Sequence, residues 1–266
     1  LSVAHDDIAD MFDCDTDGVY TAKDNSLFIT MGSEEYELAH YFTDNPVSLK
    51  TFDDDLIVGF EIFKGNPDII SFDKDTILGI DWDSRGTDIG LEFGDSKYKG
   101  KISIQDALCE ILKEDKENKY ILYDHGSGEI ADYIAIQETD RQLSIKLYHV
   151  KKKSAAGFNS STADVYEVAG QAVKSIVWLT TRGKFADKVI SRHIAGHCQP
   201  VVGNYRECLQ AIRDTSKQMV ANIVIVQPAL SRSVDMPDKI QEVLASASSY
   251  IKRAGKVQGL EIMGSK

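Results

Sequence analysis

The 266-residue chain lacks the features of a secreted or membrane-spanning protein. No apolar run approaches the roughly 20 residues that a membrane helix needs, and the first residues have neither the basic nor the apolar region of a signal peptide. There are only four cysteines and they are scattered, so we expect the reduced thiols of a cytoplasmic protein and no disulfide framework. The chain also lacks an initiator methionine, which suggests a segment of a longer protein.

The net charge of −12 is unusual for a nucleic-acid-binding protein, but its distribution is uneven. Residues 1–100 hold 23 acidic and 7 basic side chains, whereas residues 151–266 hold 9 acidic and 17 basic ones. A basic segment attracts phosphate groups. The C-terminal part of the chain is therefore compatible with a nucleic-acid partner, although a solvated basic surface explains the same pattern.

The composition and the hydrophobic pattern of the sequence change near residue 100. Residues 1–100 are rich in Asp, Gly and aromatic side chains, and short apolar runs alternate with turn signals, which predicts an acidic, β-rich domain. The expected strands of this domain are 26–31, 56–63, 76–81 and 88–93. Residues 101–266 have longer helical and strand-like patterns, which predicts a second domain.

The second domain is predicted to alternate helices and strands, which is typical of the α/β (α+β) class. A capping box formed by Ser103 and Asp106 begins the first helix. Strands are expected over 120–123, 130–137, 143–150, 221–226 and 258–263. Further helices are expected over 161–179, 184–195, 205–217 and 237–253. The resulting order is α-β-β-β-α-(α)-β-α-β.

Residues 119–151 carry the candidate chemistry. Side chains alternate along a strand, so His149 and Lys151 point to one face, and Asp132 at the head of the neighbouring strand can reach it. A carboxylate suits Mg²⁺, and a lysine beside it can orient the attacking water and stabilise developing negative charge. Glu129 shares this site if a bulge or turn distorts the strand. The pattern predicts a cation site for phosphodiester hydrolysis.

The helix expected over 161–179 supports the same site. Glu167, Gln171, Lys174 and Trp178 recur at i, i+4, i+7 and i+11, which places them on one polar face. If this face lies over the hairpin, Gln171 and Lys174 meet the substrate backbone or the attacking water. The alternative is a solvent-exposed helix face, and Trp178 is expected to pack rather than to stack on a base.

The segment 128–135 (GEIADYIA), followed by 147–151 (LYHVK), resembles the PD-(D/E)xK, or restriction-endonuclease-like, nuclease superfamily. The resemblance implies an αβββαβ core with a mixed sheet. It also implies that Asp132 is the motif Asp, Lys151 the motif Lys and Gln171 the helix Gln. Either Glu129 or Glu110 matches the extra acid that some members carry. His149 stands at the position of the motif's (D/E).

The stretch 120–179 is similar to nuclease segments attached to bacterial helicase-like proteins of phage defence. The resemblance implies a metal-dependent deoxyribonuclease that uses Mg²⁺ or Mn²⁺, with Asp132, His149 and Glu129 as metal ligands. It implies DNA and the helicase-like domains of a longer parent chain as partners, allows a homodimer, and involves no membrane. The lysines expected to contact nucleic acid are Lys152, Lys153 and Lys174.

His149 is the departure from the superfamily pattern. A neutral imidazole binds a divalent ion but supplies no negative charge, so the site favours softer ions such as Mn²⁺, or it does not cleave. The alternative reading is therefore a catalytically degenerate module on the same fold that binds nucleic acid or protein. A separate set of zinc-ligand types lacks the paired spacing of zinc fingers and is expected to be ordinary surface or core residues: His193, His197, Cys198 and Cys208.

Overall fold

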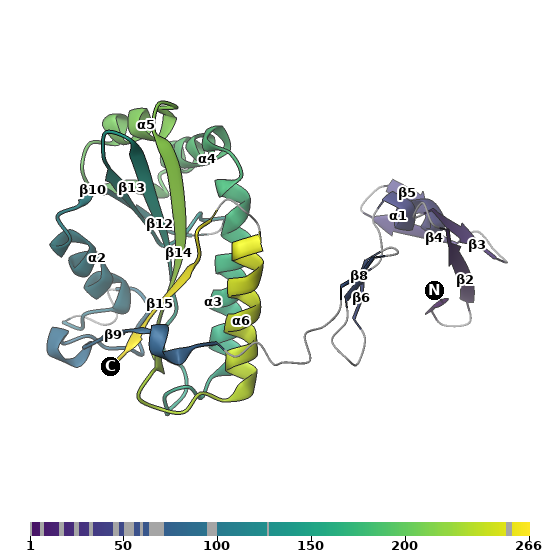
Figure 1. The fold of residues 1–266 in the computed structure, drawn as a ribbon, viewed down its shortest axis with the longest axis horizontal. Helices are drawn as coiled ribbons and strands as arrows, with labels where there is room; N and C mark the ends of the chain where they lie inside the picture. Colours follow the sequence, from purple (N-terminus) through teal and green to yellow (C-terminus); the bar gives the residue numbers. More distant parts are fainter. Residues whose placement is uncertain are drawn as a thin grey trace. The chain divides into compact units, whose positions relative to one another are not determined.

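The computed structural model describes residues 2–5, 8–15, 19–23, 27–31, 34–44, 48–50, 56–58, 61–63, 72–94, 100–126, 128–253 and 257–266 (Figure 1). The chain forms two compact units, Leu1–Ile69 and Ile70–Lys266. The boundary that the sequence placed at residue 100 thus differs from the structure. The reason is strand β9 (Leu78–Ile80), which pairs in parallel with the C-terminal strand β15 (Leu260–Ser265).

The first unit is rich in short antiparallel strands, as its alternation of apolar runs and turn signals predicts. Its strands are β1 (Ser2–His5), β2 (Ile8–Cys14), β3 (Tyr20–Ala22), β4 (Phe28–Met31), β5 (Glu34–Glu37), β6 (Ser48–Lys50), β7 (Leu56–Val58) and β8 (Glu61–Phe63). Helix α1 (Leu38–Asp44) places Leu38 and Ala39 in a small core with Phe12 and Tyr20. The strand expected over 56–63 is a hairpin of two strands.

The second unit is built on a mixed sheet whose described strands have the order β13-β10-β11-β12-β14-β15-β9. Strands β10 (Asn118–Asp124), β11 (Tyr133–Glu138) and β12 (Gln142–Val150) form an antiparallel meander. Strand β12 then pairs in parallel with β14 (Gln218–Ser231), and β14 with β15. Strand β13 (Cys198–Val202), which the sequence patterns did not predict, pairs with the outer edge of β10.

Helices cover both faces of this sheet (Figure 1). Helix α2 (Ile104–Glu114) begins at the predicted capping box and packs on one face, where Leu108 joins Tyr148 and Val150. The other face is covered by α3 (Thr162–Ser175), α4 (Arg182–Ile194), α5 (Tyr205–Arg213) and α6 (Asp238–Arg253). Strand β12 therefore alternates as expected: its even-numbered residues 148 and 150 face α2, and Leu147 faces the α3 side.

The prediction of a strand over residues 88–93 is wrong. Asp88 accepts hydrogen bonds from the backbone N–H groups of Gly90 and Leu91, so the chain turns here. Only an isolated bridge between Thr87 and Ile102 remains in this region. The turn brings the Glu92 carboxylate to 3.5 Å from the ammonium group of Lys151. No helix among the described residues has the length and apolar character needed to cross a membrane.

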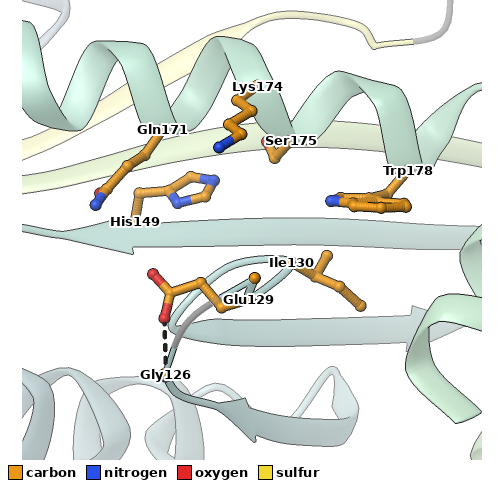
Figure 2. Close-up of a pocket in the computed structure, with 9 residues that line it drawn as sticks. Gly126, Glu129, Ile130, His149, Gln171, Lys174, Ser175 and Trp178 are labelled. Atoms are coloured by element: carbon orange, nitrogen blue, oxygen red, sulfur yellow. Dashed lines mark hydrogen bonds between the residues drawn. The ribbon is translucent and has the colours of Figure 1, made fainter. Parts of the chain in front are cut away.

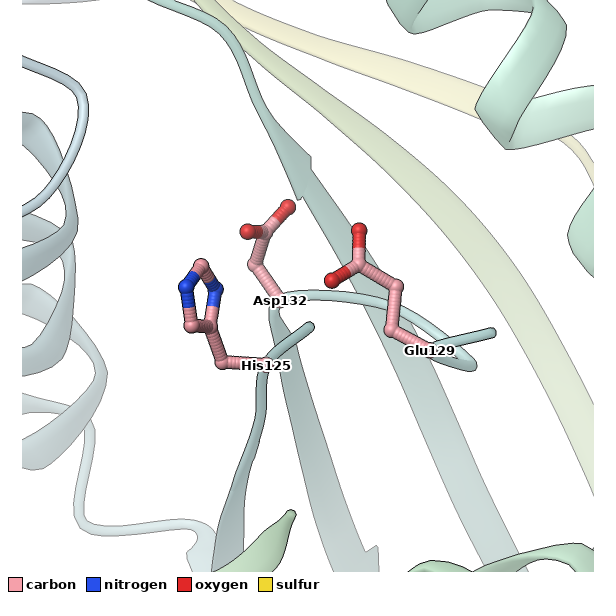
Figure 3. A group of neighbouring side chains, drawn as sticks. All are labelled: His125, Glu129 and Asp132. Atoms are coloured by element: carbon pink, nitrogen blue, oxygen red, sulfur yellow. The ribbon is translucent and has the colours of Figure 1, made fainter. Parts of the chain in front are cut away.

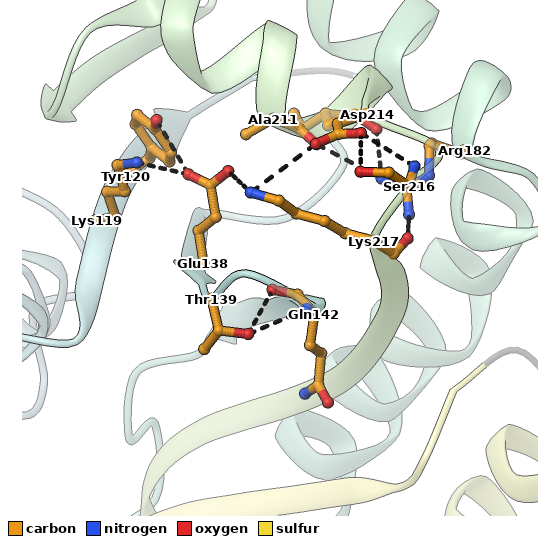
Figure 4. A network of polar contacts seen from close by, with 11 residues as sticks. Lys119, Tyr120, Glu138, Thr139, Gln142, Arg182, Ala211, Asp214, Ser216 and Lys217 are labelled. Carbon is orange, nitrogen blue, oxygen red and sulfur yellow. Dashed lines mark hydrogen bonds and ion pairs between the residues drawn. The ribbon is translucent and has the colours of Figure 1, made fainter.

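An ion-pair network holds the hairpin between β11 and β12 at the end of the strands opposite the candidate site (Figure 4). Glu138 Oε2 accepts a hydrogen bond from Lys119 Nζ at 2.6 Å, and Oε1 accepts one from Lys217 Nζ. These two hydrogen bonds hold the pKa of Glu138 below its ordinary value. Arg182, the first residue of α4, donates to the carbonyl oxygens of Ile212 and Lys217. The network thus joins elements that are distant in sequence.

We expect Glu138→Gln to lower the free energy of unfolding by about 2 kcal/mol, because it leaves two ammonium groups beside a neutral amide. Chemical denaturation at pH 7 measures this change. The matched control is Glu110→Gln, which breaks the exposed pair with Lys113 and is expected to have no measurable effect. Equal effects of the two substitutions contradict a structural role for the network.

Candidate functional site

Three side chains gather in the loop between β10 and β11: His125, Glu129 and Asp132 (Figure 3). One ligand atom of each lies within 4.8 Å of the ligand atoms of the other two. Gly126 and Gly128 have φ angles of +99° and +77°, which turn the backbone in a way that other residues rarely adopt. The Gly126 N–H donates to Glu129 Oε2 at 3.2 Å. This turn is the distortion that lets Glu129 and Asp132 share a site.

A buried ion pair fixes the same loop. Arg192 Nε donates to Asp124 Oδ1 at 2.7 Å, and Asp124 Oδ2 accepts from the Ile130 N–H at 2.8 Å. Arg192 also donates to the carbonyl oxygen of His125 at 3.0 Å. Both members of the ion pair are almost fully buried, with side-chain exposures of 7% and 0%. These contacts hold the backbone at His125 and Ile130, next to the two carboxylates and the imidazole of the cluster.

Asp132 is held in place by two donors and is buried. Its Oδ2 accepts from the Val150 N–H at the end of β12 at 2.8 Å, and its Oδ1 accepts from Gln105 Nε2 of α2 at 2.5 Å. Burial, followed by the nearby Glu129 carboxylate, raises the pKa of Asp132 to about 8. Asp132 therefore keeps its proton at neutral pH unless positive charge arrives.

The donor chemistry of the cluster fits a divalent cation. Burial also raises the pKa of Glu129, and Nδ1 of His125 is buried without a hydrogen-bond partner in the described part of the chain. One cation would stabilise the ionised form of both carboxylates, whose pKa values are raised, and would also give the imidazole nitrogen a partner. Metal–ligand bonds of 2.0–2.2 Å keep ligand atoms within about 4.4 Å of one another, so the cluster needs only a small contraction. Two oxygens and one nitrogen suit Mg²⁺ or Mn²⁺, with the nitrogen favouring Mn²⁺.

His149 lies outside this cluster, in a pocket between β12 and α3 (Figure 2). The group among the described residues that could hold a metal ion thus contains Asp132 and Glu129, together with His125 and not His149. The His149 residue is 2% exposed, and neither ring nitrogen has a partner there. Burial lowers the pKa of His149 to about 4, so the ring is neutral at neutral pH.

The pocket has a volume of about 330 Å³ and adjoins the cluster through Glu129, which lines both. Its lining on the α3 side includes Gln171, Lys174 and Trp178, three of the four residues that the sequence placed on one polar helix face. That face therefore lies over the sheet. Gln171 Oε1 is a further buried atom without a partner within the described ranges. The remaining lining residues are Gly126, Gly128, Ile130, His149 and Ser175.

Lys151 is held by two carboxylates. Its Nζ lies 2.6 Å from Glu167 Oε1 of α3 and 3.5 Å from Glu92 Oε2. Burial lowers the pKa of Lys151, but the hydrogen bond that Lys151 donates to Glu167 and the charge of Glu92 outweigh burial and raise it above the ordinary value. Lys151 is therefore an ammonium ion, suited to stabilising negative charge and not to accepting a proton.

The other lysines expected at the site are placed differently. Lys174 is exposed at the pocket. Lys152 is exposed and does not line the pocket, and Lys153 Nζ lies 4.2 Å from the centroid of the Phe158 ring. The sequence patterns missed His125 and Glu92. His125 follows the end of β10 directly, one residue before Gly126, and that position was the only local signal for it.

Replacing His149 by leucine is expected to raise the free energy of unfolding by about 1 kcal/mol, because two buried nitrogens without partners are removed. Urea denaturation at pH 7.5 measures the change. The matched control is His193→Leu, which loses a ring stack on Tyr205 (centroids 3.6 Å apart) and a 2.7 Å contact with the Cys198 carbonyl. This control is expected to be destabilised. A His149 variant that loses as much stability as the control contradicts the view that His149 is unsatisfied.

Comparisons of the chain with protein-family models, with curated proteins and with solved structures found no match. The site must therefore be judged on its own geometry. Within the described ranges, the group of side chains that could hold a metal ion does not include His193, His197, Cys198 or Cys208, and their expected role as ordinary residues stays a prediction.

Proposed function

We propose that the chain is a divalent-metal-dependent nuclease that hydrolyses phosphodiester bonds on a restriction-endonuclease-like core. The observation that carries the proposal is the cluster of His125, Glu129 and Asp132. Its two carboxylates have raised pKa values, and its imidazole has a buried nitrogen without a partner among the described residues. Strongly perturbed titratable groups beside a pocket are typical of functional sites.

The topology supports the same proposal. A capped helix (α2) precedes an antiparallel meander (β10, β11 and β12), a second helix (α3) follows, and β14 pairs in parallel with β12. Apart from α4, β13 and α5, which are inserted between α3 and β14, this order supports the αβββαβ core that the resemblance implies. Asp132 stands directly before β11 and Lys151 directly after β12, so two motif positions come from neighbouring strand ends.

Each side chain has a distinct role in the proposed reaction. Asp132, Glu129 and His125 would hold Mg²⁺ or Mn²⁺, which when bound supplies charge neutralisation at the phosphoryl group and lowers the pKa of water. The neutral ring of His149 and the amide of Gln171 offer hydrogen bonds inside the pocket. The Lys151 ammonium ion stabilises negative charge on the phosphoryl oxygens when a phosphate replaces one of its two carboxylate partners.

One observation favours the alternative function, a binding module that does not cleave. The Lys151 ammonium ion already has two carboxylate partners, Glu92 and Glu167. A substrate phosphate must compete with them, and a module that never displaces them binds without hydrolysis. DNA as the substrate, a helicase-like partner in antiviral defence, a homodimer and a cytoplasmic location stay predictions.

Incubation of single-stranded and supercoiled DNA with Mg²⁺, Mn²⁺ or EDTA tests the proposal. We expect cleavage only with a metal ion, and a loss of about 100-fold or more in Asp132→Asn, which keeps the shape of the side chain but not its charge. Asp140→Asn, at an exposed position between β11 and β12, is the matched control and should cleave normally. Full cleavage by Asp132→Asn contradicts the site. An inactive wild type in both metals favours the binding module.

A further inference from the structure

The pocket beside the metal cluster has an aromatic and basic end. Figure 2 places Trp178 at one end of the pocket and Gln171 and His149 towards the other. Lys188 Nζ of α4 lies over the Trp178 ring, 4.4 Å from its centroid, and Lys184 Nζ lies 5.9 Å from it. The pocket therefore has at this end an indole ring with two ammonium groups close to it, although Lys184 and Lys188 are not part of the pocket lining.

This combination is typical of sites for unpaired nucleotides. Proteins that bind single strands combine basic side chains for the backbone with aromatic rings on which bases stack. A base inside a duplex is stacked on both sides, so it cannot reach a recessed ring unless it leaves the stack. The pocket volume of about 330 Å³ suits one small ligand group and not a double helix.

The polar atoms of the pocket fit the same occupant. Both nitrogens of His149 and Oε1 of Gln171 are buried without partners among the described residues. A nucleotide carries hydrogen-bond donors and acceptors on its base and sugar, which can satisfy such atoms. Trp178 packs against the core, as the sequence predicted, and also lines the pocket.

We infer that this pocket is a subsite for one unpaired nucleotide of a single-stranded nucleic acid. Its base stacks on Trp178, and its phosphate lies against the ammonium groups of Lys174 and Lys188. The subsite lies next to Glu129 of the metal cluster, so the inference rests on the proposed function and specifies its substrate class as single-stranded nucleic acid.

Equilibrium binding without hydrolysis tests the inference. Fluorescence anisotropy in EDTA measures the affinity for a labelled single-stranded DNA, the RNA of the same sequence and the DNA duplex. Trp178→Leu keeps apolar packing against the core but removes the ring, and thermal melting checks that it folds. We expect it to weaken single-strand binding about tenfold or more and to leave duplex binding unchanged. Lys188→Ala is expected to reduce the salt dependence of single-strand binding by about one ion.

Tyr250→Ala is the matched control, because it removes a 59% exposed aromatic ring from α6, outside the pocket, and should change nothing. An affinity for single-stranded DNA or RNA that depends on Trp178 supports the subsite. The strand that binds more tightly shows whether the subsite prefers deoxyribose or ribose. A folded Trp178→Leu variant that binds single strands as the wild type does overturns the subsite. If the wild type binds through Trp178 but cleaves nothing, the subsite stands and the proposed nuclease fails. If Trp178→Leu cleaves and binds single strands as the wild type does, the proposed nuclease stands and the subsite fails.

Discussion

Lys151→Met is expected to lower the rate of phosphodiester cleavage by about 10²- to 10³-fold, the loss typical of removing one group that stabilises developing charge. Methionine keeps the length and apolar character of the lysine stem and removes only the ammonium group. The hydrogen bond that this group donates to Glu167 and the charge of Glu92 keep it protonated, so no proton-accepting role is lost. Single-turnover cleavage of a labelled DNA with saturating Mn²⁺ measures the change.

The same substitution is expected to leave the affinity for Mn²⁺ within about twofold, because the three proposed ligands lie in another loop and keep their contacts. Lys146→Met is the matched control, since Lys146 lies on β12, away from the site, and pairs with Glu261. It should cleave at the rate of the wild type. If Lys151→Met cleaves at the wild-type rate, Lys151 has no role in the reaction. If its affinity for Mn²⁺ falls as much as its cleavage rate, Lys151 acts in the metal site.

The affinity for Mn²⁺ is expected to rise about tenfold per pH unit between pH 6 and pH 8, because binding releases the proton of Asp132. The pKa of this group is about 8 without a cation, so the rise should level off above that pH. Calorimetric titration at several pH values measures both the affinity and the proton released. In Asp132→Asn the steep dependence should disappear together with most of the affinity, whereas Asp140→Asn should keep both.

The same pKa shift predicts how the metal-free protein responds to pH. The folded-state pKa of Asp132 is raised above 3.8, so its contribution to stability is complete below pH 4 and is lost as the pH rises through about 8. The lowered pKa of His149, about 4, has the opposite effect, which is confined to the range between pH 4 and 6.5. Above pH 6.5 the His149 contribution no longer changes with pH, whereas the Asp132 contribution continues to fall.

The free energy of unfolding of Asp132→Asn, relative to that of the wild type, should consequently rise by about 2 kcal/mol between pH 6.5 and pH 8.5 in EDTA. The amide can keep both hydrogen bonds if Gln105 turns its own amide around. Urea denaturation across this pH range measures the difference. A difference that does not rise between pH 6.5 and pH 8.5 contradicts the raised pKa and, with it, the requirement for a cation.

Local patterns predict the elements that surround the site. The capping box at Ser103 predicts the start of α2, and helical spacing predicts that Gln171, Lys174 and Trp178 share a face. Alternation along β12 predicts that Tyr148 and Val150 share a face. These features depend on neighbours within a few turns or along one strand, so they can be recognised without knowledge of the rest of the fold.

The parts that the sequence patterns missed depend on distant contacts. Strand β9 is short and becomes part of the second unit only by pairing with β15, some 180 residues later. Strand β13 contains Pro200 and lies at the edge of the sheet, so it lacks the apolar alternation of an inner strand. Glu92 reaches Lys151 from a turn that resembled a strand. His125 becomes a candidate ligand only because the loop folds back on Glu129 and Asp132.

The central claim is that His125, Glu129 and Asp132 hold the cation of a nuclease. Anomalous diffraction from crystals of the protein grown with Mn²⁺ tests it most directly. We predict a peak bound by one imidazole nitrogen of His125 and by the carboxylates of Glu129 and Asp132, at distances of about 2.0–2.2 Å. A peak held by His149 without His125, or no peak at Mn²⁺ concentrations that support cleavage, would contradict the claim.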